Sequence, residues 1–219
     1  MVHFAVDDAQ VKFCTRLQGK ESWFLPFNKG YKDGAGNPPN PDGLMTDYLW
    51  KQILTKDMLS RIIENYATLV EEKDEETGKT RYKQIFPRYH QLTAVESLLA
   101  DVKKNGVGNR YLIQHSAGSG KSNSIAWLAH QLTGLEDAQG NLLVDSVIVV
   151  TDRVVLDKQI RDTIRQFAQT RNIVAWAEHS GDLRKAIEDG RRIIITTIEK
   201  FPYVLPEIGE DHKDRHFAI

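Results

Sequence analysis

Short, apolar runs rich in β-branched residues alternate with amphipathic stretches in the second half of the chain. This alternation constrains the fold more than any other feature. The runs cover residues 147–150, 173–176 and 193–196. Continuous apolar runs of this length indicate strands buried on both faces, and parallel strands need helical crossovers between them. From Ile85 onward the sequence therefore predicts an α/β fold, a parallel sheet flanked by helices.

Apolar residues recur at helical spacing between these runs. The spacing predicts helices at residues 89–104, 121–132, 156–167 and 180–188. Two further strands are expected, at 111–113 before the second helix and at 217–219. Asn105-Gly106, Gly134 and Gly190 supply the expected helix ends.

The first 84 residues have a different texture and are expected to form a small β-rich and linker segment before an α/β domain at 85–219. Alternation and β-propensity predict strands at 2–6, 11–17 and 24–27, followed by a loop rich in proline and glycine at 28–44. A helix is expected from 55 to 70, with Thr55 as its N-cap, and a charged, solvated linker at 71–80.

Composition sets broad limits on function. The chain has 219 residues, 41% hydrophobic and 27% charged, with a net charge of −1 and a pI near 6.7. A uniformly basic surface is excluded, so any contact with nucleic acid must come from local cations. The single cysteine, Cys14, allows no internal disulfide and is expected to be an inert structural thiol.

The first residues do not resemble a signal peptide, because Asp7 and Asp8 stand where such a peptide is apolar. No apolar run approaches the ~20 residues of a membrane span. The sequence therefore predicts a cytoplasmic protein without a membrane partner.

Residues His115 to Ser122 form a glycine-rich loop between an expected strand and an expected helix. The sequence His-Ser-Ala-Gly-Ser-Gly-Lys-Ser fits the end of the phosphate-loop pattern Gly-x-x-x-x-Gly-Lys-Ser/Thr, with His115 in place of the first glycine. Such loops curl backbone amides around phosphate oxygens, and the helix that follows adds its positive end. The candidate nucleotide contacts are Ala117, Gly118, Ser119, Gly120, Lys121 and Ser122.

Two residues of this loop have individual roles in the prediction. Lys121 is expected to reach the β- and γ-phosphates, which makes it the candidate catalytic residue, and Ser122 is expected to ligate Mg²⁺. ATP and Mg²⁺ are the predicted cofactors. The loop alone shows only that a nucleoside triphosphate binds, because kinases, GTPases, transporters and helicases share it.

An upstream segment suggests which base is read. Gln91 lies at an expected helix start, 30 residues before Lys121, and an amide offers the donor and acceptor that adenine N6 and N7 require. Phe86 or Tyr89 would stack on the base or pack in a core, and both readings stay open.

Polar residues follow two of the expected parallel strands, at the edge where α/β sheets bind ligands. They are Thr151, Asp152 and Arg153 after one strand, and Thr196, Thr197 and Lys200 after the other. Hydroxyls and cations there suit the phosphates of a polynucleotide. A local ion pair or helix cap is the alternative for Asp152 and Arg153.

These motifs together closely resemble the restriction (motor) subunit of type I restriction-modification enzymes. The resemblance rests on Phe-Pro-Arg-Tyr-His-Gln at 86–91, the loop with the helix that follows it at 115–130, Val-Val-Thr-Asp-Arg at 149–153 and Ile-Thr-Thr-Ile-Glu-Lys-Phe at 195–201. The segments 2–6, 24–30 and 34–40 also look like that subunit, so the likeness covers nearly the whole chain.

The resemblance implies a partial RecA-like lobe of a superfamily-2 helicase-like translocase. Such a protein hydrolyses ATP to move double-stranded DNA past methylase and specificity subunits, and it cleaves the DNA far from the recognition site. By this analogy Gln91 reads adenine, Lys121 and Ser122 contact ATP and Mg²⁺, and residues 151–153 belong to the DNA track.

Two motifs of that family, Asp-Glu-Ala-His and the nuclease motif, do not occur here. The segment nearest to a nuclease motif, Glu71-Glu72-Lys73, lies in the charged linker and is expected to be solvated. We therefore expect a fragment that binds ATP without hydrolysing it. The alternatives are another superfamily-2 DNA motor, a non-catalytic assembly module that docks other restriction subunits and, least favoured, a small-molecule P-loop kinase.

Overall fold

The computed structural model describes residues 1–73, 78, 80–152, 160–164, 173–203 and 214–219. Contacts between residues divide the chain into two compact units, Met1–Thr93 and Ala94–Ile219, and the boundary falls within helix α2. Each unit is described by itself below. The domain boundary expected between residues 84 and 85 stays a prediction.

The first unit begins with a three-stranded antiparallel sheet. Its strands are β1 (His3–Val6), β2 (Val11–Cys14) and β3 (Leu25–Pro26), with a short 3-10 turn, η1 (Gly19–Glu21), between the last two. All three strands lie where the sequence predicts them, although each is shorter than expected. Cys14 is free and buried.

An aromatic cluster fills the interior of this unit. Four phenylalanine rings pack with centroids 5.4–6.3 Å apart, and Tyr89 and Tyr48 extend the cluster with edge-on contacts. The phenylalanines are Phe4, Phe13, Phe27 and Phe86. Edge-to-face packing of this kind adds to the burial of apolar area, so a short sheet gains a sizeable core.

The expected loop at 28–44 forms neither helix nor strand, apart from an isolated bridge between Tyr31 and Gly34. It is held to the unit by the buried Asn37, whose amide nitrogen donates to the Ala9 carbonyl and whose oxygen accepts from the Lys29 amide. This buried side-chain amide thus adds to the few backbone hydrogen bonds within the loop, such as the one from the Gly30 amide to the Gly36 carbonyl at 2.9 Å.

The expected helix at 55–70 is only half right. Helix α1 runs over Lys56–Asn65 after a single π-type turn, η2 (Leu49–Ile53), and Thr55 is its N-cap, since the Thr55 hydroxyl accepts from the Met58 amide. The chain then becomes strand β4 (Thr68–Lys73), which pairs antiparallel with β5 (Thr80–Ile85). The helical spacing of Leu69 is therefore coincidental.

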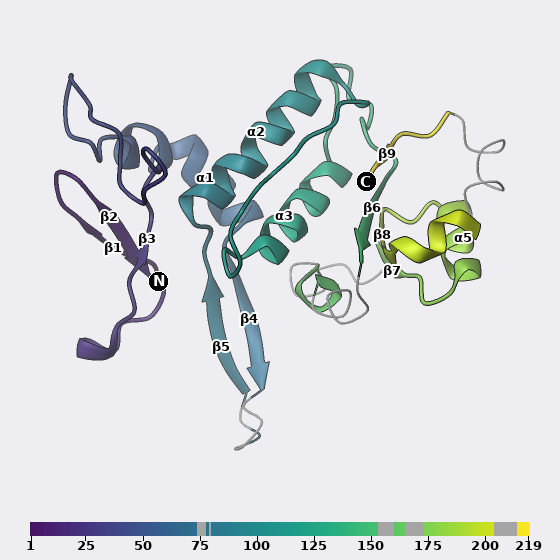
Figure 1. The fold of residues 1–219 in the computed structure, drawn as a ribbon, viewed down its shortest axis with the longest axis horizontal. Helices are drawn as coiled ribbons and strands as arrows, with labels where there is room; N and C mark the ends of the chain where they lie inside the picture. Colours follow the sequence, from purple (N-terminus) through teal and green to yellow (C-terminus); the bar gives the residue numbers. More distant parts are fainter. Residues whose placement is uncertain (74–77, 79, 153–159, 165–172, 204–213) are drawn as a thin grey trace. The chain divides into compact units, whose positions relative to one another are not determined.

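The hairpin also corrects the expected linker at 71–80, because both of its ends belong to strands. In Figure 1 the two strands run side by side as a long ribbon. Across the ladder the hydroxyl of Tyr82 donates to the carboxylate of Glu71, its direct partner, at 3.0 Å. Cross-strand pairs of this kind stabilise the hairpin, although the charged sequence at 71–80 predicts a solvated linker.

The second unit contains the predicted parallel sheet. Its strands are β6 (Ser146–Thr151), β7 (Val174–Trp176), β8 (Ile193–Thr197) and β9 (Phe217–Ala218), in the order β7-β8-β6-β9. Every neighbouring pair is parallel. The α/β class and all four of these strands are therefore confirmed.

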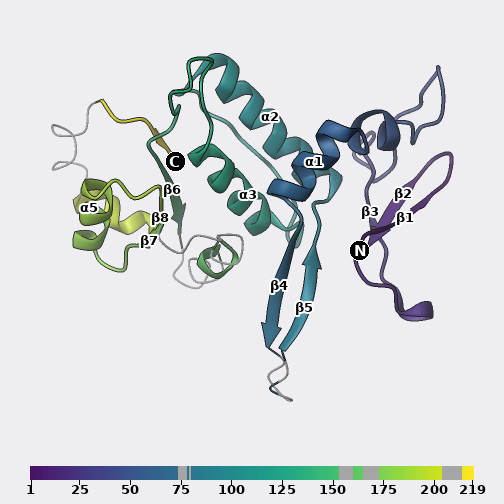
Figure 2. The ribbon, with the colours of Figure 1, turned by 180° about the vertical axis from the view of Figure 1, so that it is seen from behind.

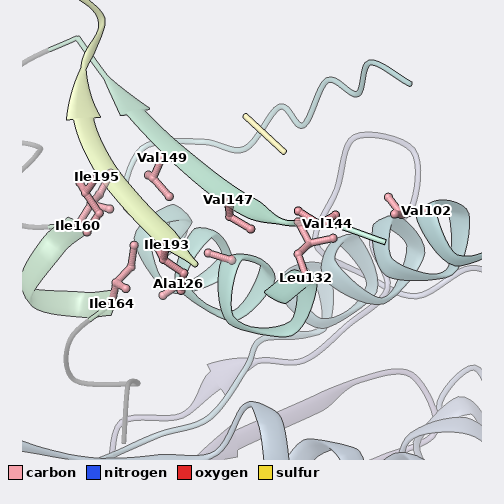
Figure 3. Packing of buried hydrophobic residues seen from close by; sticks show 11 residues of the cluster. Val102, Ala126, Leu132, Val144, Val147, Val149, Ile160, Ile164, Ile193 and Ile195 are labelled. Carbon is pink, nitrogen blue, oxygen red and sulfur yellow. The ribbon is translucent and has the colours of Figure 1, made fainter. Parts of the chain in front are cut away.

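Helices cover the two faces of this sheet, as Figures 1 and 2 show from opposite sides. Helix α3 (Lys121–Thr133) packs on one face and helix α5 (Ser180–Glu188) on the other. Alternate strand residues supply the two cores. Val147, Val149, Ile193 and Ile195 face α3 (Figure 3), whereas Ile148 and Ile194 face Leu183, Ala186 and Ile187 of α5.

Helix α2 (Tyr89–Asn105) confirms another prediction, but the strand expected at 111–113 does not form. Leu112 is 92% exposed, and the Tyr111 hydroxyl donates to the Asp101 carboxylate at 2.6 Å. That hydrogen bond raises the pKa of Tyr111. The strands at the two edges of the sheet are β7 and β9.

Of the helix expected at 156–167, residues 160–164 are helical and the others lie outside the described residues. Ile160 and Ile164 are buried against the α3 face of the sheet. Among the residues described, no helix is both long and apolar enough to cross a bilayer.

Ile193 in β8 is fully buried, so we predict that Ile193→Ala lowers the free energy of unfolding by about 2–5 kcal/mol, through reduced apolar burial and the cavity left behind. The matched control is Ile198→Ala, because Ile198 is 61% exposed and its truncation should cost less than about 0.5 kcal/mol. Urea unfolding followed by circular dichroism measures both. Equal losses would contradict the central place of β8.

Candidate nucleotide-binding site

Two glycines shape the loop that leads into helix α3. Gly118 and Gly120 have φ values of +71° and +85°, a region that side chains with a Cβ rarely adopt. A Cβ at Gly118 would meet no atom within 4 Å, so its glycine serves the backbone conformation rather than close packing. The positive φ values therefore explain why glycine occupies both positions.

The N-terminus of α3 is left without a side-chain cap. Gly120 is the N-cap residue, and its carbonyl accepts from the amides of Asn123 and Ser124. No carboxylate stands in the first turn of α3. The positive end of the helix dipole is thus available to an anion that arrives from outside the chain.

The side chain of Lys121 folds back over the loop. Its ammonium donates to the carbonyl oxygens of Ser116, at 2.8 Å, and His115, at 3.2 Å. Lys121 itself is exposed, so these bonds hold a positive charge above the loop at the surface. A phosphate group can replace the two carbonyls as acceptor without breaking any buried contact.

The other predicted loop residues differ in exposure. Ala117 and Gly118 are exposed, Ser122 is half-buried, and Ser119 is buried with its amide donating to the Ser116 carbonyl at 3.3 Å. Within the described part of the chain, no three His, Cys, Asp or Glu side chains gather as a metal site. The Ser122 hydroxyl follows Lys121 directly, and its role as a Mg²⁺ ligand stays a prediction.

Gln91 is buried in the first turn of α2, where its side-chain oxygen accepts from the backbone amide of Arg88 at 2.9 Å. It therefore satisfies one of the amides that a helix start leaves unpaired. Its role in reading adenine is not tested by this arrangement and stays a prediction.

The structure favours core packing for the two aromatic residues beside Gln91. Phe86 lies 5.4–6.3 Å from three other phenylalanine rings, and Tyr89 contacts Phe27 and Tyr48. Burial raises the pKa of Tyr89. Of the two readings left open, these contacts support the structural one.

Three of the residues expected to line a DNA track, all of them threonines, lie together at the carboxyl ends of β6 and β8. Thr151 pairs with Thr197 in the parallel register, and Thr196 lies one step before. All three threonines are buried, whereas Asp152 is exposed and Arg153 lies outside the described residues. The structure thus brings the threonines together without presenting their hydroxyls to solvent.

Lys200 joins two strand ends at the same edge. Its ammonium donates to the carbonyl of Ala177, just after β7, at 2.6 Å, and the Thr197 hydroxyl donates to Glu199 at 3.1 Å. These bonds organise the segment after β8, and contact with DNA by Lys200 stays a prediction.

Sequence reasoning missed Arg192, which connects the C-terminal end of α3 to the amino-terminal ends of strands β6 and β8. Its guanidinium donates to the Asp145 carbonyl, at 2.6 Å, and to the Thr133 carbonyl in the last turn of α3. A cation at a helix C-terminus complements the dipole, and here it also fixes the helix whose other end carries the loop. An arginine just before a buried strand was the available signal.

A parallel sheet with helices on both faces, a glycine loop and an uncapped helix together define a P-loop nucleotide-binding unit. Residues 90–217 match the family of SWI2/SNF2 ATPases, more than half of the chain, and the protein belongs to this family. It therefore carries part of an ATP-dependent, helicase-like motor domain, whose cofactor is ATP, typically with Mg²⁺. No curated protein matches the chain.

Because Gly120 has φ +85°, we predict that Gly120→Ala destabilises the loop by about 1–2 kcal/mol and weakens ATP binding, since an L side chain is strained there. Gly134→Ala is the control: Gly134 ends the same helix at φ −109° with no atom within 4 Å of an added Cβ. Urea unfolding and titration with a fluorescent ATP analogue measure both variants. Unchanged binding in Gly120→Ala would contradict the role given to this conformation.

Proposed function

We propose that this chain is the ATP-binding part of the restriction (motor) subunit of a type I restriction-modification enzyme, an ATP-dependent DNA translocase and endonuclease. The observation that carries the nucleotide site is the loop at 115–122, where Lys121 lies beside an uncapped helix start. Membership of the SWI2/SNF2 ATPase family supports the motor. The motifs at 86–91, 149–153 and 195–201 support the finer assignment.

In this proposal the loop residues hold the triphosphate. The amides of residues 117–122 surround phosphate oxygens, and Lys121 exchanges its carbonyl acceptors for the β- and γ-phosphates. Ser122 ligates Mg²⁺, and Gln91 reads adenine through its amide. When bound, Mg-ATP supplies the phosphoryl group whose transfer to water drives such motors.

The proposed polymer partner is double-stranded DNA. Residues Thr151 to Arg153, with Thr196, Thr197 and Lys200, form its track at the carboxyl ends of β6 and β8, the edge where ligands of α/β sheets bind. The buried threonines would organise this edge, while Asp152 and Arg153 follow the end of β6 in the sequence. Methylase and specificity subunits are the proposed protein partners.

The 219-residue chain is proposed to bind Mg-ATP without turnover. Its sequence has no Asp-Glu-Ala-His motif, whose carboxylates hold Mg²⁺ and orient the attacking water in this class of motor. We propose no nuclease role for the segment Glu71-Glu72-Lys73, since Glu71 is exposed and its carboxylate accepts from the Tyr82 hydroxyl across a hairpin.

Lys121→Ala is expected to weaken ATP binding at least about 10-fold, because charge-assisted hydrogen bonds to phosphate contribute roughly 1.5–3 kcal/mol. Lys185→Ala is the control, an exposed lysine of α5 in the same unit. Calorimetric titration with Mg-ATP measures binding, and phosphate release with and without duplex DNA measures turnover. Binding that Lys121→Ala removes, with flat phosphate release, supports the proposal.

DNA-stimulated phosphate release by this chain would contradict the proposed lack of turnover. ATP binding unaffected by Lys121→Ala would contradict the assignment of the loop itself.

For the DNA track we predict that Arg153→Ala weakens duplex binding to the same extent for unrelated sequences, since an interaction with phosphate carries no base information. The slope of log K against log salt should fall by about 0.9, because one neutralised phosphate is removed from the complex. Fluorescence anisotropy with two unrelated duplexes measures this, and Arg184→Ala, whose guanidinium pairs with Glu188 in α5, is the control. An unchanged slope would remove Arg153 from the track.

A further inference from the structure

The loop between β2 and β3 in the first unit presents a tryptophan to solvent. Trp23 is 78% exposed, far more than is usual for the largest apolar side chain, and Leu17 of the same loop is 54% exposed. No ring or cation contact joins Trp23 to any residue that the structure describes. The indole face is therefore open to a flat ligand.

Hydrogen bonds close this loop into a defined shape. The hydroxyl of Ser22 accepts from the Gln18 amide and donates to the Gly19 carbonyl, both at 2.8 Å, and the Ser22 amide donates to the same carbonyl at 3.2 Å. These hydrogen bonds close residues 18–22 into a turn. Leu17 precedes this turn and Trp23 follows it, so the exposed indole is attached directly to a hydrogen-bonded segment.

Two cations, Arg16 and Lys20, lie on the same loop as Trp23. Arg16 and Lys20 are exposed, and neither takes part in an ion pair with a described residue. The loop contains one acidic residue, Glu21. An exposed tryptophan with exposed cations on the same loop is a combination with which proteins bind single-stranded nucleic acid, because bases stack on the ring and phosphates contact the cations.

We infer that this loop, with Trp23, Arg16 and Lys20 at its centre, is a binding surface for a single-stranded segment of nucleic acid. It is a second nucleic-acid surface, separate in sequence from the proposed duplex track, and rests on the proposed function only in that the partner is a polynucleotide. A base stacks on Trp23, and the flanking phosphates contact Arg16 and Lys20. The site has no sequence preference, since every base has a π-face.

The experiment uses the whole 219-residue chain and fluorescence anisotropy with three labelled probes. The probes are a single-stranded oligonucleotide of about 12 nucleotides, within the ~4–16 that one such surface covers, an abasic strand of equal length, and a duplex. We expect Trp23→Ala to weaken binding of the single strand about 5-fold to 100-fold, as the loss of one stacked base does. Trp23→Phe should retain most of the affinity.

The same variants should leave the abasic strand and the duplex unaffected. Arg16→Ala and Lys20→Ala should each lower the salt slope for the single strand by about 0.7. Trp50→Ala and Lys51→Ala are the matched controls, because Trp50 is a partly exposed tryptophan of η2 and Lys51 is already paired with Asp47. Circular dichroism confirms that each variant is folded.

Four outcomes would overturn the inference: no binding of the single strand, no effect of Trp23→Ala, an equal loss with the abasic strand, or an equal loss with the duplex. Lys121→Ala and Arg153→Ala separate this surface from the proposed function. If these two variants leave ATP and duplex binding unchanged while Trp23→Ala weakens single-strand binding, the proposed motor function is contradicted and the single-strand surface is supported. The reverse result removes the loop surface alone.

Discussion

The burial of the strand pair β6–β8 between helices α3 and α5 is the interaction on which the second unit depends. Odd-numbered residues of both strands face α3 and even-numbered residues face α5, so one parallel ladder serves two cores. Such a ladder is stable only when both faces are covered. Packing against it fixes the axis of α3, and the phosphate loop occupies the start of that helix. The position of Lys121 is thus a consequence of core packing some distance from the loop.

Electrostatic features complete what packing begins. Arg192 holds the C-terminal end of α3 through the Thr133 carbonyl, while the other end of the helix begins at Gly120 without a cap. The protein itself therefore supplies a cation at the C-terminal end of the helix dipole, whereas the N-terminal end is open to an anion. Lys121 rests on backbone carbonyls, which are acceptors that a phosphate can replace. In our proposal this asymmetry is the physical basis by which a protein of the SWI2/SNF2 ATPase family binds its nucleotide.

The first unit has a different source of stability. Its strands are short, and six aromatic rings, with the buried Asn37, hold together a sheet, a loop and the start of α2. This explains why Phe86 and Tyr89, for which the sequence left both base stacking and core packing open, pack within the aromatic cluster. It also leaves Trp23 as an exception, an aromatic side chain that the core does not use and that the β2–β3 loop exposes.

The sequence by itself determined the features that depend on local pattern: the phosphate loop, helices α2, α3 and α5, the N-cap at Thr55 and the buried strands of the parallel sheet. These follow from backbone conformations and apolar periodicities that residues within one turn or one strand dictate. Only the tertiary structure decided where a segment's partner lies. Residues 68–73 became a strand because 80–85 pair with them, whereas residues 111–113 pair with no strand that the structure describes. The burial of Thr196 and the use of Gln91 at a helix start were decided in the same way, since hydrogen-bond partners and solvent access are properties of neighbours distant in the chain.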